Sequence, residues 1–392
     1  MNSNYAVDPI QMRFLIENCK EPLRFKNYIG CNVMEWSLEK WKAILKDEIM
    51  EFRCGVSKYT KNPQWERTTK IEHMKFDDFL TTMETNSKKW LYFDYKYLKD
   101  WLSNVEELKN EISWEAFGFP ELNFEHSTLW IGSKGAHTPC HKDTYGSNII
   151  FQIFGQKEWI IFPPEENLQQ TRIPYEESSI YSKLNFYSPN PKDFKALSRC
   201  RKITLNPGDV LFLPNKWWHY VENLETSISL NTWISMEVDH EERINESLIQ
   251  LIISQFSKDL NKDQQKILLN PNIQDEIQNL NFATAIETVN FCKEKFMEEQ
   301  KNKKFKSEQN ENAKPQNFLS VDKILDENVF IEKVNVMSNE EFHQYIENKS
   351  KNFKIDTNFD DNEIRNNCIE KTIDAFTDPD VISLVKQKLL NS

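Results

Sequence analysis

Short apolar runs, each the length of a β-strand, dominate the chain from about residue 126 to residue 238. The runs are STLWI, NIIFQIF, EWIIF, KITL, DVLFL, HYVEN and SISLNTWIS, and Gly, Pro and Asn punctuate the segments between them. Strand-length runs that are separated by turn residues, without regular helices between them, are typical of a β-barrel or β-sandwich. The pattern therefore predicts a mainly β core over residues 126–238, interrupted by one insertion at residues 165–199.

The part of the chain before this core carries mixed signals. Residues 1–125 contain both strand-like and helical patterns, and we expect helices and strands that support the core. Apolar residues at three- and four-residue spacing predict a helix from Leu38 to Phe52. Two further helices are expected at residues 77–83 and 96–108.

The part after the core has a helical period. An apolar stripe that begins at Ile244 predicts helices over residues 239–297. Residues 298–317 are nearly all charged or amide-bearing, which predicts a disordered linker. Residues 318–392 are expected to form a helical tail that ends in an amphipathic segment from Val381 to Leu390.

Composition supports this division of the chain. Only 8 of the 392 residues are Gly, and six of these lie from Gly118 to Gly208. All 11 Trp lie at or before Trp233. We therefore expect the tightly turned, aromatic part of the molecule to end near Val238.

Charge and cysteine content bear on partners and compartment. A formal net charge of -12 disfavours a broad nucleic-acid-binding surface. The first twenty residues show no apolar run after a basic start, so we expect neither a secretory signal nor a membrane span. The seven cysteines form no CxxC pair and are interpreted as reduced thiols. These features favour a cytoplasmic protein, with the nucleus as the alternative.

One constellation carries candidate metal chemistry. His141 and Asp143 form a His-x-Asp pair at the end of an early strand, and His219 opens a strand near the end of the predicted barrel. Two imidazoles and one carboxylate on one side of a metal are the ligands of the facial iron triad, which leaves positions open for other ligands. A His-x-Asp pair alone is more often a solvated turn, but its place between two strands favours the metal hypothesis.

A lysine inside the predicted barrel suggests an anionic ligand. Lys157 follows Gly155 between two largely apolar strands, where an unpaired charge costs several kcal/mol. The distal carboxylate of 2-oxoglutarate would be a suitable anion. Thr138 and Asn148 could donate hydrogen bonds to the same ligand, and Asn231 could face the metal from the last strand. For each polar residue alone, a turn or capping role is the simpler interpretation.

These motifs resemble a known family. The segments STLWIGSKGAHTPCHKDTYGSNIIFQIFGQKEWIIFPP and ITLNPGDVLFLPNKWWHYVENLETSISLNTWIS are similar to the core of the small, cupin-like JmjC-domain dioxygenases. Further segments, including WLYFDYKYL, WEAFGFP and IDAFTDPDVISLVKQKLL, are similar to the members of that family that associate with a small heat-shock protein. The resemblance covers most of the chain outside residues 298–317.

The resemblance implies a double-stranded β-helix, or jelly roll, that uses iron(II) with 2-oxoglutarate and O2 as cosubstrates. It implies that His141, Asp143 and His219 bind the metal. The residues that it implies for 2-oxoglutarate are Thr138, Asn148, Lys157 and Asn231. It places Trp233 beside the substrate cleft, and it implies one tyrosine contact for which Tyr92, Tyr95 and Tyr97 are candidates.

The resemblance favours a protein hydroxylase, with a protein substrate and a link to a small heat-shock protein and the stress response. Two alternatives stay open. The first is a catalytically weak or inactive binding protein associated with chaperones. The second is a JmjC demethylase or a tRNA-base hydroxylase. The sequence leaves the substrate and the oligomeric state undetermined, because the shape of the cleft and the insertion at residues 165–199 bear on the substrate.

Overall fold

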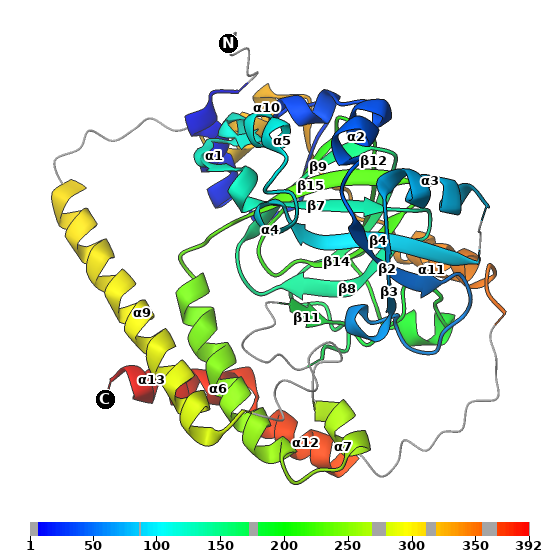
Figure 1. Cartoon of the computed structure of the whole chain (residues 1–392). Coiled ribbons are helices and arrows are strands. Elements are labelled where there is room, and N and C mark those ends of the chain that lie inside the picture. Colours follow the sequence, from blue (N-terminus) through cyan, green and yellow to red (C-terminus); the bar gives the residue numbers. More distant parts are fainter. Residues whose placement is uncertain are drawn as a thin grey trace.

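The computed structural model describes residues 7–85, 88–171, 179–268, 280–310, 319–354 and 367–391. Two antiparallel sheets form its centre (Figure 1). The larger sheet has nine strands, in the spatial order β16 (Ile331–Lys333), β1 (Leu23–Phe25), β13 (Val210–Leu213), β9 (Ser147–Phe154), β15 (Ser227–Ile234), β7 (Ser127–Gly132), β4 (Lys89–Tyr97), β2 (Met50–Val56) and β3 (Lys70–Met74). The smaller sheet has five, in the order β11 (Ser179–Tyr181), β8 (His137–Asp143), β14 (Trp218–Asn223), β10 (Lys157–Phe162) and β12 (Arg201–Leu205). A separate pair joins β5 (Ser113–Trp114) to β6 (Phe119–Asn123).

The chain alternates between the two sheets. Strands β7, β9, β13 and β15 lie in the larger sheet, whereas β8, β10, β12 and β14 lie in the smaller one. This alternation is the topology of a double-stranded β-helix, so the predicted fold class is confirmed. Each of the seven apolar runs forms one of these strands. The insertion between β10 and β12 contains β11 and a short 3-10 helix, η5 (Pro191–Phe194).

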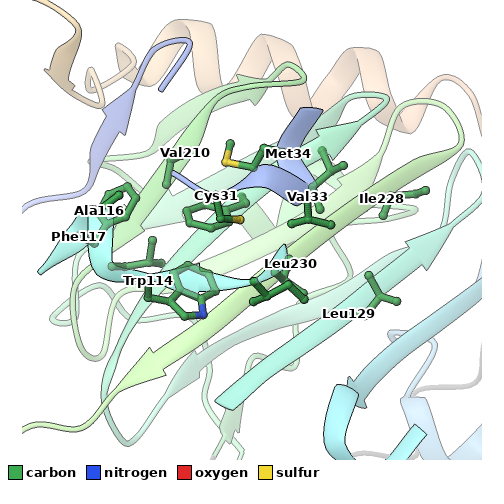
Figure 2. Packing of buried hydrophobic residues seen from close by; sticks show 14 of the residues in the cluster. Cys31, Val33, Met34, Trp114, Ala116, Phe117, Leu129, Val210, Ile228 and Leu230 are labelled. Atoms are coloured by element: carbon green, nitrogen blue, oxygen red, sulfur yellow. The ribbon is translucent and has the colours of Figure 1, made fainter. Parts of the chain in front are cut away.

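Strands β7, β9, β10, β13, β14 and β15 are buried on both faces along most of their length, which explains why their runs are apolar rather than alternating. Successive residues of a strand point to opposite faces. On β9, Ile149 and Phe151 pack outward against the N-terminal part, while Ile150 faces the interior between the sheets. Figure 2 shows the outer cluster, where Trp114 and Phe117 lie among side chains of the larger sheet.

Short helices of the N-terminal part supply the other half of that outer cluster. They are α1 (Pro9–Asn18), α2 (Leu38–Leu45), α3 (Phe76–Thr85), α4 (Leu98–Trp101), α5 (Glu106–Glu111) and the 3-10 turns η1 (Asn32–Glu35), η3 (Glu115–Phe117) and η4 (Phe124–His126). A further 3-10 turn, η2 (Glu66–Thr68), has no buried residue. Side chains such as Leu15, Trp41 and Phe79 are fully buried in the outer cluster. The expected mixed α/β part is thus an extension of the larger sheet with a layer of helices over it.

Two predicted helices in this part differ from the structure. The helix predicted from Leu38 to Phe52 ends at Leu45, and strand β2 begins at Met50. Ile49 and Phe52 fit a helical spacing by chance, but the residues that follow alternate between buried and partly exposed as a strand requires. The helix predicted over residues 96–108 is divided among the end of β4, α4 and the start of α5.

The helices α6 (Asp239–Ser257), α7 (Lys262–Leu268), α9 (Phe282–Asn310), α12 (Asn367–Phe376) and α13 (Pro379–Leu390) pack on one another to one side of the sheets (Figure 1). The linker predicted at residues 298–317 is wrong over its first part, since α9 continues to Asn310. Glu, Lys and Gln are good helix formers, and residues 282–310 contain no Gly or Pro. Residues 311–318 lie outside the described residues. None of the described helices is long and apolar enough to span a membrane.

The predicted helical tail also contains a strand. Residues 319–353, called the strap here, comprise α10 (Val321–Glu327), β16 and α11 (Asn339–Ser350). Strand β16 pairs with β1 at the edge of the larger sheet, and Val336 bridges to Arg201 at the edge of the smaller sheet. The backbone amide of Val334 donates to the carbonyl of Pro22, next to β1, and the amide of Met337 donates to the carbonyl of Cys200, next to β12. The strap therefore joins the two sheets where the barrel is open.

We expect Phe342→Ala, in α11, to lower the free energy of unfolding by about 3–5 kcal/mol, because it empties a packed aromatic site. Phe342 is 1% exposed, and its ring lies 5.5 Å from that of Phe162 on the smaller sheet. Urea denaturation followed by tryptophan fluorescence measures the change. Val329→Ala is the matched control, because Val329 lies in the same strap and is 92% exposed. Equal stability of the two variants would contradict the docking of the strap.

Candidate metal centre

The pairing of β8 with β14 brings the candidate metal ligands together. His141 and His219 are directly opposite each other in the register of these strands, and their ring centroids lie 4.1 Å apart. Asp143 is two residues beyond His141 and therefore on the same face. Metal-binding atoms of the three side chains lie within 4.8 Å of one another, and all three residues are buried. The structure thus forms the triad that the spacing predicted.

The backbone determines which nitrogen of each imidazole faces the centre. Nδ1 of His141 lies 2.9 Å from the carbonyl of Pro139, and Nδ1 of His219 lies 3.0 Å from that of Trp217. Because a carbonyl oxygen only accepts, these contacts assign the proton to Nδ1 and leave the Nε2 lone pair available. Burial and the neighbouring His219 hold the pKa of His141 well below its ordinary value. His141 is therefore neutral, as a metal ligand must be.

Hydrogen bonds also orient the carboxylate. The indole Nε1 of Trp233 donates to Oδ2 of Asp143 at 2.8 Å, and the Asn148 amide lies 3.5 Å from the same oxygen. The other oxygen, Oδ1, lies 3.7 Å from Nε2 of His141. Oδ2 of Asp143 is thus held by the Trp233 indole, while Oδ1 faces the imidazoles.

Two further hydrogen bonds continue this arrangement. Asn231 donates from Nδ2 to Oδ1 of Asn148 at 2.8 Å, and Trp130 donates to Oδ1 of Asn231 at 2.7 Å. Each amide is bonded through both of its ends, so its orientation is fixed. The chain of contacts links β7, β15 and β9 to the carboxylate on β8.

A tight turn between β8 and β9 follows the carboxylate. Gly146 adopts a φ of +68°, and a Cβ atom at this position would lie 2.9 Å from the carbonyl oxygen of Ile234. A side chain is therefore excluded on both conformational and steric grounds. Asp239 at the start of α6 accepts a hydrogen bond from the Gly146 amide at 3.0 Å, which anchors the turn to the C-terminal helices.

Lys157 lies inside the barrel on β10 and is 2% exposed. Its Nζ donates to Oγ of Ser229 at 2.6 Å and to the hydroxyl of Tyr92 at 3.3 Å. Among the described residues, these bonds go to hydroxyl groups rather than to a carboxylate. Burial lowers the pKa of Lys157 to about 7, although Asp94 partly opposes this effect. The site is thus suited to an anion that would restore the charge.

The structure separates the three candidate tyrosines. The hydroxyl of Tyr92 lies beside Lys157 and is hydrogen-bonded to Thr138. Tyr95 packs against the ring of Trp130 with 4.6 Å between centroids. Tyr97 is 43% exposed and lies outside the cavity. Tyr92 is therefore the tyrosine in position to contact a ligand of Lys157.

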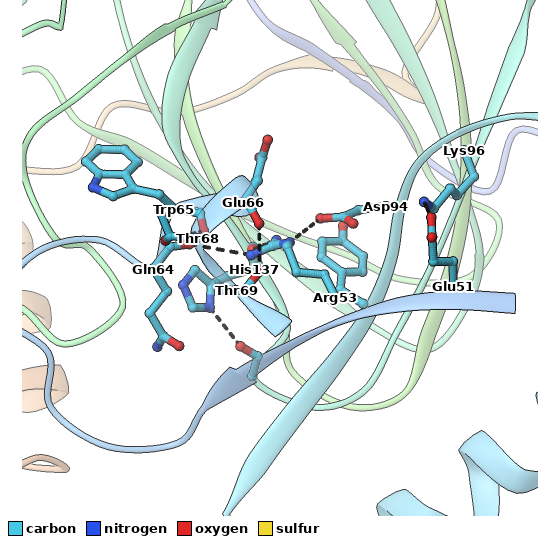
Figure 3. Close-up of polar contacts among 12 residues, drawn as sticks. Glu51, Arg53, Gln64, Trp65, Glu66, Thr68, Thr69, Asp94, Lys96 and His137 are labelled. Atoms are coloured by element: carbon cyan, nitrogen blue, oxygen red, sulfur yellow. Dashed lines mark hydrogen bonds and ion pairs between the residues drawn. The ribbon is translucent and has the colours of Figure 1, made fainter. Parts of the chain in front are cut away.

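A buried ion pair lies next to the ring of Tyr92, and no pattern in the sequence predicted it. Arg53 on β2 donates to Asp94 at 2.7 Å and to the carbonyl of His137 at 2.7 Å (Figure 3). Both charged side chains are buried, and the guanidinium lies 5.8 Å from the centre of the Tyr92 ring. Arg53 directly follows the segment for which a helix was predicted, and its pairing with β4 depends on strand β2, which was not predicted.

The candidate residues line a single cavity between the two sheets. The lining includes all the site residues that the sequence predicted, namely Thr138, His141, Asp143, Asn148, Lys157, His219, Asn231 and Trp233. The residues that the sequence did not single out for the site, or left as alternatives, are Tyr92, Tyr95, Trp130, Ile150, Trp159, Val221 and Ser229. The structure therefore brings every predicted site residue together, and Tyr97 is the one candidate tyrosine that it leaves out. Their roles as ligands stay predictions.

A second hollow, called the outer cleft here, adjoins this cavity. It shares Tyr95, Asp143 and Trp233 with the cavity. Its other lining residues are Glu66, Arg67, Tyr97, Lys99, Glu125, His126, Tyr145, Gly146, Ser179, Ser235, Asp239 and Arg243. The outer cleft thus leads from the surface to the metal side of the cavity.

Comparisons with known proteins agree with this geometry. Residues 21–240 match the family described as cupin-like domain. HSPB1-associated protein 1 of Homo sapiens is 37% identical over 285 residues, which cover 67% of this chain and 58% of the relative. The 2-oxoglutarate and iron-dependent oxygenase JMJD4 of Mus musculus is 26% identical over 218 residues, 46% of this chain and 45% of the relative. The lysine-specific demethylase JMJ30 of Arabidopsis thaliana is 30% identical over 177 residues, 43% of this chain and 40% of the relative. The chain spans less than two thirds of the length of the HSPB1-associated proteins that it matches.

We expect His219→Ala or Asp143→Ala to weaken the binding of Co(II) by more than about 100-fold, since loss of a residue that only supports a ligand already costs about 10–100-fold. Titration followed by the visible absorption of Co(II) gives the affinity. His73→Ala is the matched control, because His73 is exposed on β3. Variants of the triad that bind Co(II) as tightly as the unaltered chain would contradict the metal centre.

Proposed function

The chain belongs to the cupin-like JmjC family, and on that premise we propose that it is an iron(II)- and 2-oxoglutarate-dependent oxygenase that hydroxylates a protein. One observation carries the proposal. The cavity has a His-Asp-His triad with converging ligand atoms at one end and the buried ammonium group of Lys157 at the other. The distant relative whose name includes 2-oxoglutarate and iron gives independent support.

The donor set fits iron(II). The Nε2 atoms of His141 and His219 and one oxygen of Asp143 lie on the same side of the cavity, so the remaining coordination positions would face its interior. The hydrogen bonds at Nδ1 and Oδ2 keep these three donors oriented without further rearrangement.

The opposite end of the cavity fits the distal carboxylate of 2-oxoglutarate. The Lys157 ammonium would pair with it, and the hydroxyl groups of Tyr92 and Thr138 would donate hydrogen bonds to its oxygens. Apolar walls formed by Ile150 and Val221 limit the access of water. When bound, the two groups supply the oxidation, in which 2-oxoglutarate and O2 become succinate and CO2 while one oxygen atom enters a substrate C–H bond.

The outer cleft supports a protein substrate. It opens beside Asp143 and Trp233, so a side chain from a polypeptide lying in the cleft would reach the metal end of the cavity. Its lining of aromatic, acidic and basic residues suits the mixed surface of a polypeptide. The plant relative is named as a demethylase of lysine, which is also a protein side chain.

A small heat-shock protein is the partner that we propose. Support comes from the relatives that are named as associated with HSPB1. None of the seven cysteines, all of which lie in the described part of the chain, forms a disulfide, which fits the reducing cytoplasm in which we place the protein. The same names favour a second candidate function, a binding protein without catalytic activity. The complete triad and the buried lysine support the enzyme over this candidate.

We expect the chain with Fe(II) to convert 2-oxoglutarate slowly to succinate even without a protein substrate. Asp143→Ala should abolish this conversion, because it removes a metal ligand. Succinate measured by mass spectrometry tests the expectation, and His73→Ala should retain the rate. Absence of succinate from the unaltered, iron-loaded chain would favour the binding protein.

We expect the affinity for 2-oxoglutarate to fall as the pH rises above about 7, because the free Lys157 amine then loses its proton. Binding restores that proton, since the carboxylate raises the pKa of the amine, so Kd should increase by up to about tenfold per pH unit. Calorimetry on the Mn(II)-loaded chain at several pH values measures this dependence.

Lys157→Met should weaken 2-oxoglutarate binding and remove most of this pH dependence. Lys202→Met is the matched control, because Lys202 lies on β12 and pairs with Glu158 at 2.9 Å, outside the cavity. Equal 2-oxoglutarate affinity in Lys157→Met and the unaltered chain would remove Lys157 from this role.

A further inference from the structure

Trp233 occupies the boundary between the two hollows of the site. Its side chain lines both the inner cavity and the outer cleft, and it is partly exposed. On the cavity side its Nε1 donates to Oδ2 of Asp143 at 2.8 Å. On the cleft side its ring lies 6.3 Å from that of Tyr97. The sequence assigned Trp233 only to the substrate cleft.

We propose that Trp233 is a positioning residue that couples the outer cleft to the metal ligand Asp143, an inference that rests on the proposed oxygenase site. The Asp143 carboxylate has two oxygens, and only one of them faces the imidazoles. The Trp233 indole holds the other oxygen and so fixes the rotation of the carboxylate. The Asn148 amide lies 3.5 Å away and is the longer of the two contacts to that oxygen.

Because the Trp233 ring also lines the outer cleft, a ligand in that cleft can affect the hydrogen bond between Trp233 and Asp143. A ligand that packs against the cleft face of the Trp233 ring restrains the same ring whose N–H orients Asp143. Such a ligand and the metal therefore bind cooperatively, and each should increase the affinity for the other by the same factor. Tyr97 provides an aromatic ring next to Trp233 on this side.

Trp233→Phe tests the positioning role, because it keeps an aromatic ring but removes the donor. We expect the Kd for Co(II) to increase about 10–100-fold, as for other supporting contacts to metal ligands, with a changed visible spectrum of the bound ion. Trp114→Phe is the matched control. Trp114 lies in the outer cluster, away from the cavity, and its indole donates to Oγ of Ser127 at 2.9 Å. Loss of this hydrogen bond should leave Co(II) binding unchanged. Circular dichroism during heating checks that both variants fold.

Tyr97→Ala tests the coupling through a residue that is 43% exposed and lines the outer cleft but not the cavity. We expect it to weaken Co(II) binding by about twofold, the lower range for an aromatic pair. The effect should vanish in the Trp233→Phe background, because the donor is then already absent. An equal effect of Tyr97→Ala in both backgrounds would overturn the coupling.

The outcomes separate this inference from the proposed function. If Trp233→Phe leaves the Co(II) affinity and spectrum unchanged while the unaltered chain produces succinate, the positioning role is wrong and the oxygenase stands. If the unaltered chain produces no succinate but Trp233→Phe weakens Co(II) binding, the positioning role stands and the oxygenase is wrong. A chain that binds no Co(II) at all would overturn both.

Discussion

The pairing of β8 with β14 is the constraint on which the site depends. The register places His141 opposite His219, and the pleat places Asp143 on the same inner face. A slip of one residue in either strand would turn its triad imidazole toward the outer face of the smaller sheet. That register is held by the strands on each side, since β14 also pairs with β10 and β8 with β11. The metal centre is therefore a product of the whole smaller sheet rather than of a local loop.

The same alternation of faces explains the rest of the cavity. Inward-facing positions of β10, β15 and β9 carry Lys157, Ser229 and Asn148, while the outward-facing neighbours pack in apolar clusters. Polar groups in such an interior must be bonded, and these are bonded to one another. Among the described residues, the Lys157 ammonium donates to the hydroxyl groups of Ser229 and Tyr92 rather than to a carboxylate. An anionic ligand would complete the arrangement, which joins the fold to the proposed chemistry.

Sequence patterns predicted those parts of the molecule whose structure depends on residues close to one another along the chain. The strands were recognisable from their length and turns, and the triad from the strands on which its residues lie. Contacts between distant segments were not predictable in this way. Arg53 meets Asp94 because β2 pairs with β4, and the strap meets the barrel at β1, at Arg201 of β12 and at Phe162 of β10. The choice of Tyr92 over Tyr95 and Tyr97 depended on a register irregularity in β4.

The segment at residues 298–310 was predicted as a disordered linker but is the last part of helix α9. The prediction failed because charged and amide-bearing residues are common both in disordered segments and in polar helices.

The central claim is that one cavity holds iron(II) at the triad and 2-oxoglutarate between the triad and Lys157. Chelation of iron(II) by a keto acid produces a visible charge-transfer absorption, so the most direct measurement is the absorption spectrum under anaerobic conditions. The band should appear only when both iron(II) and 2-oxoglutarate are added, and it should be absent in Asp143→Ala. A spectrum of the unaltered chain that stays unchanged at saturating concentrations of both would contradict the account.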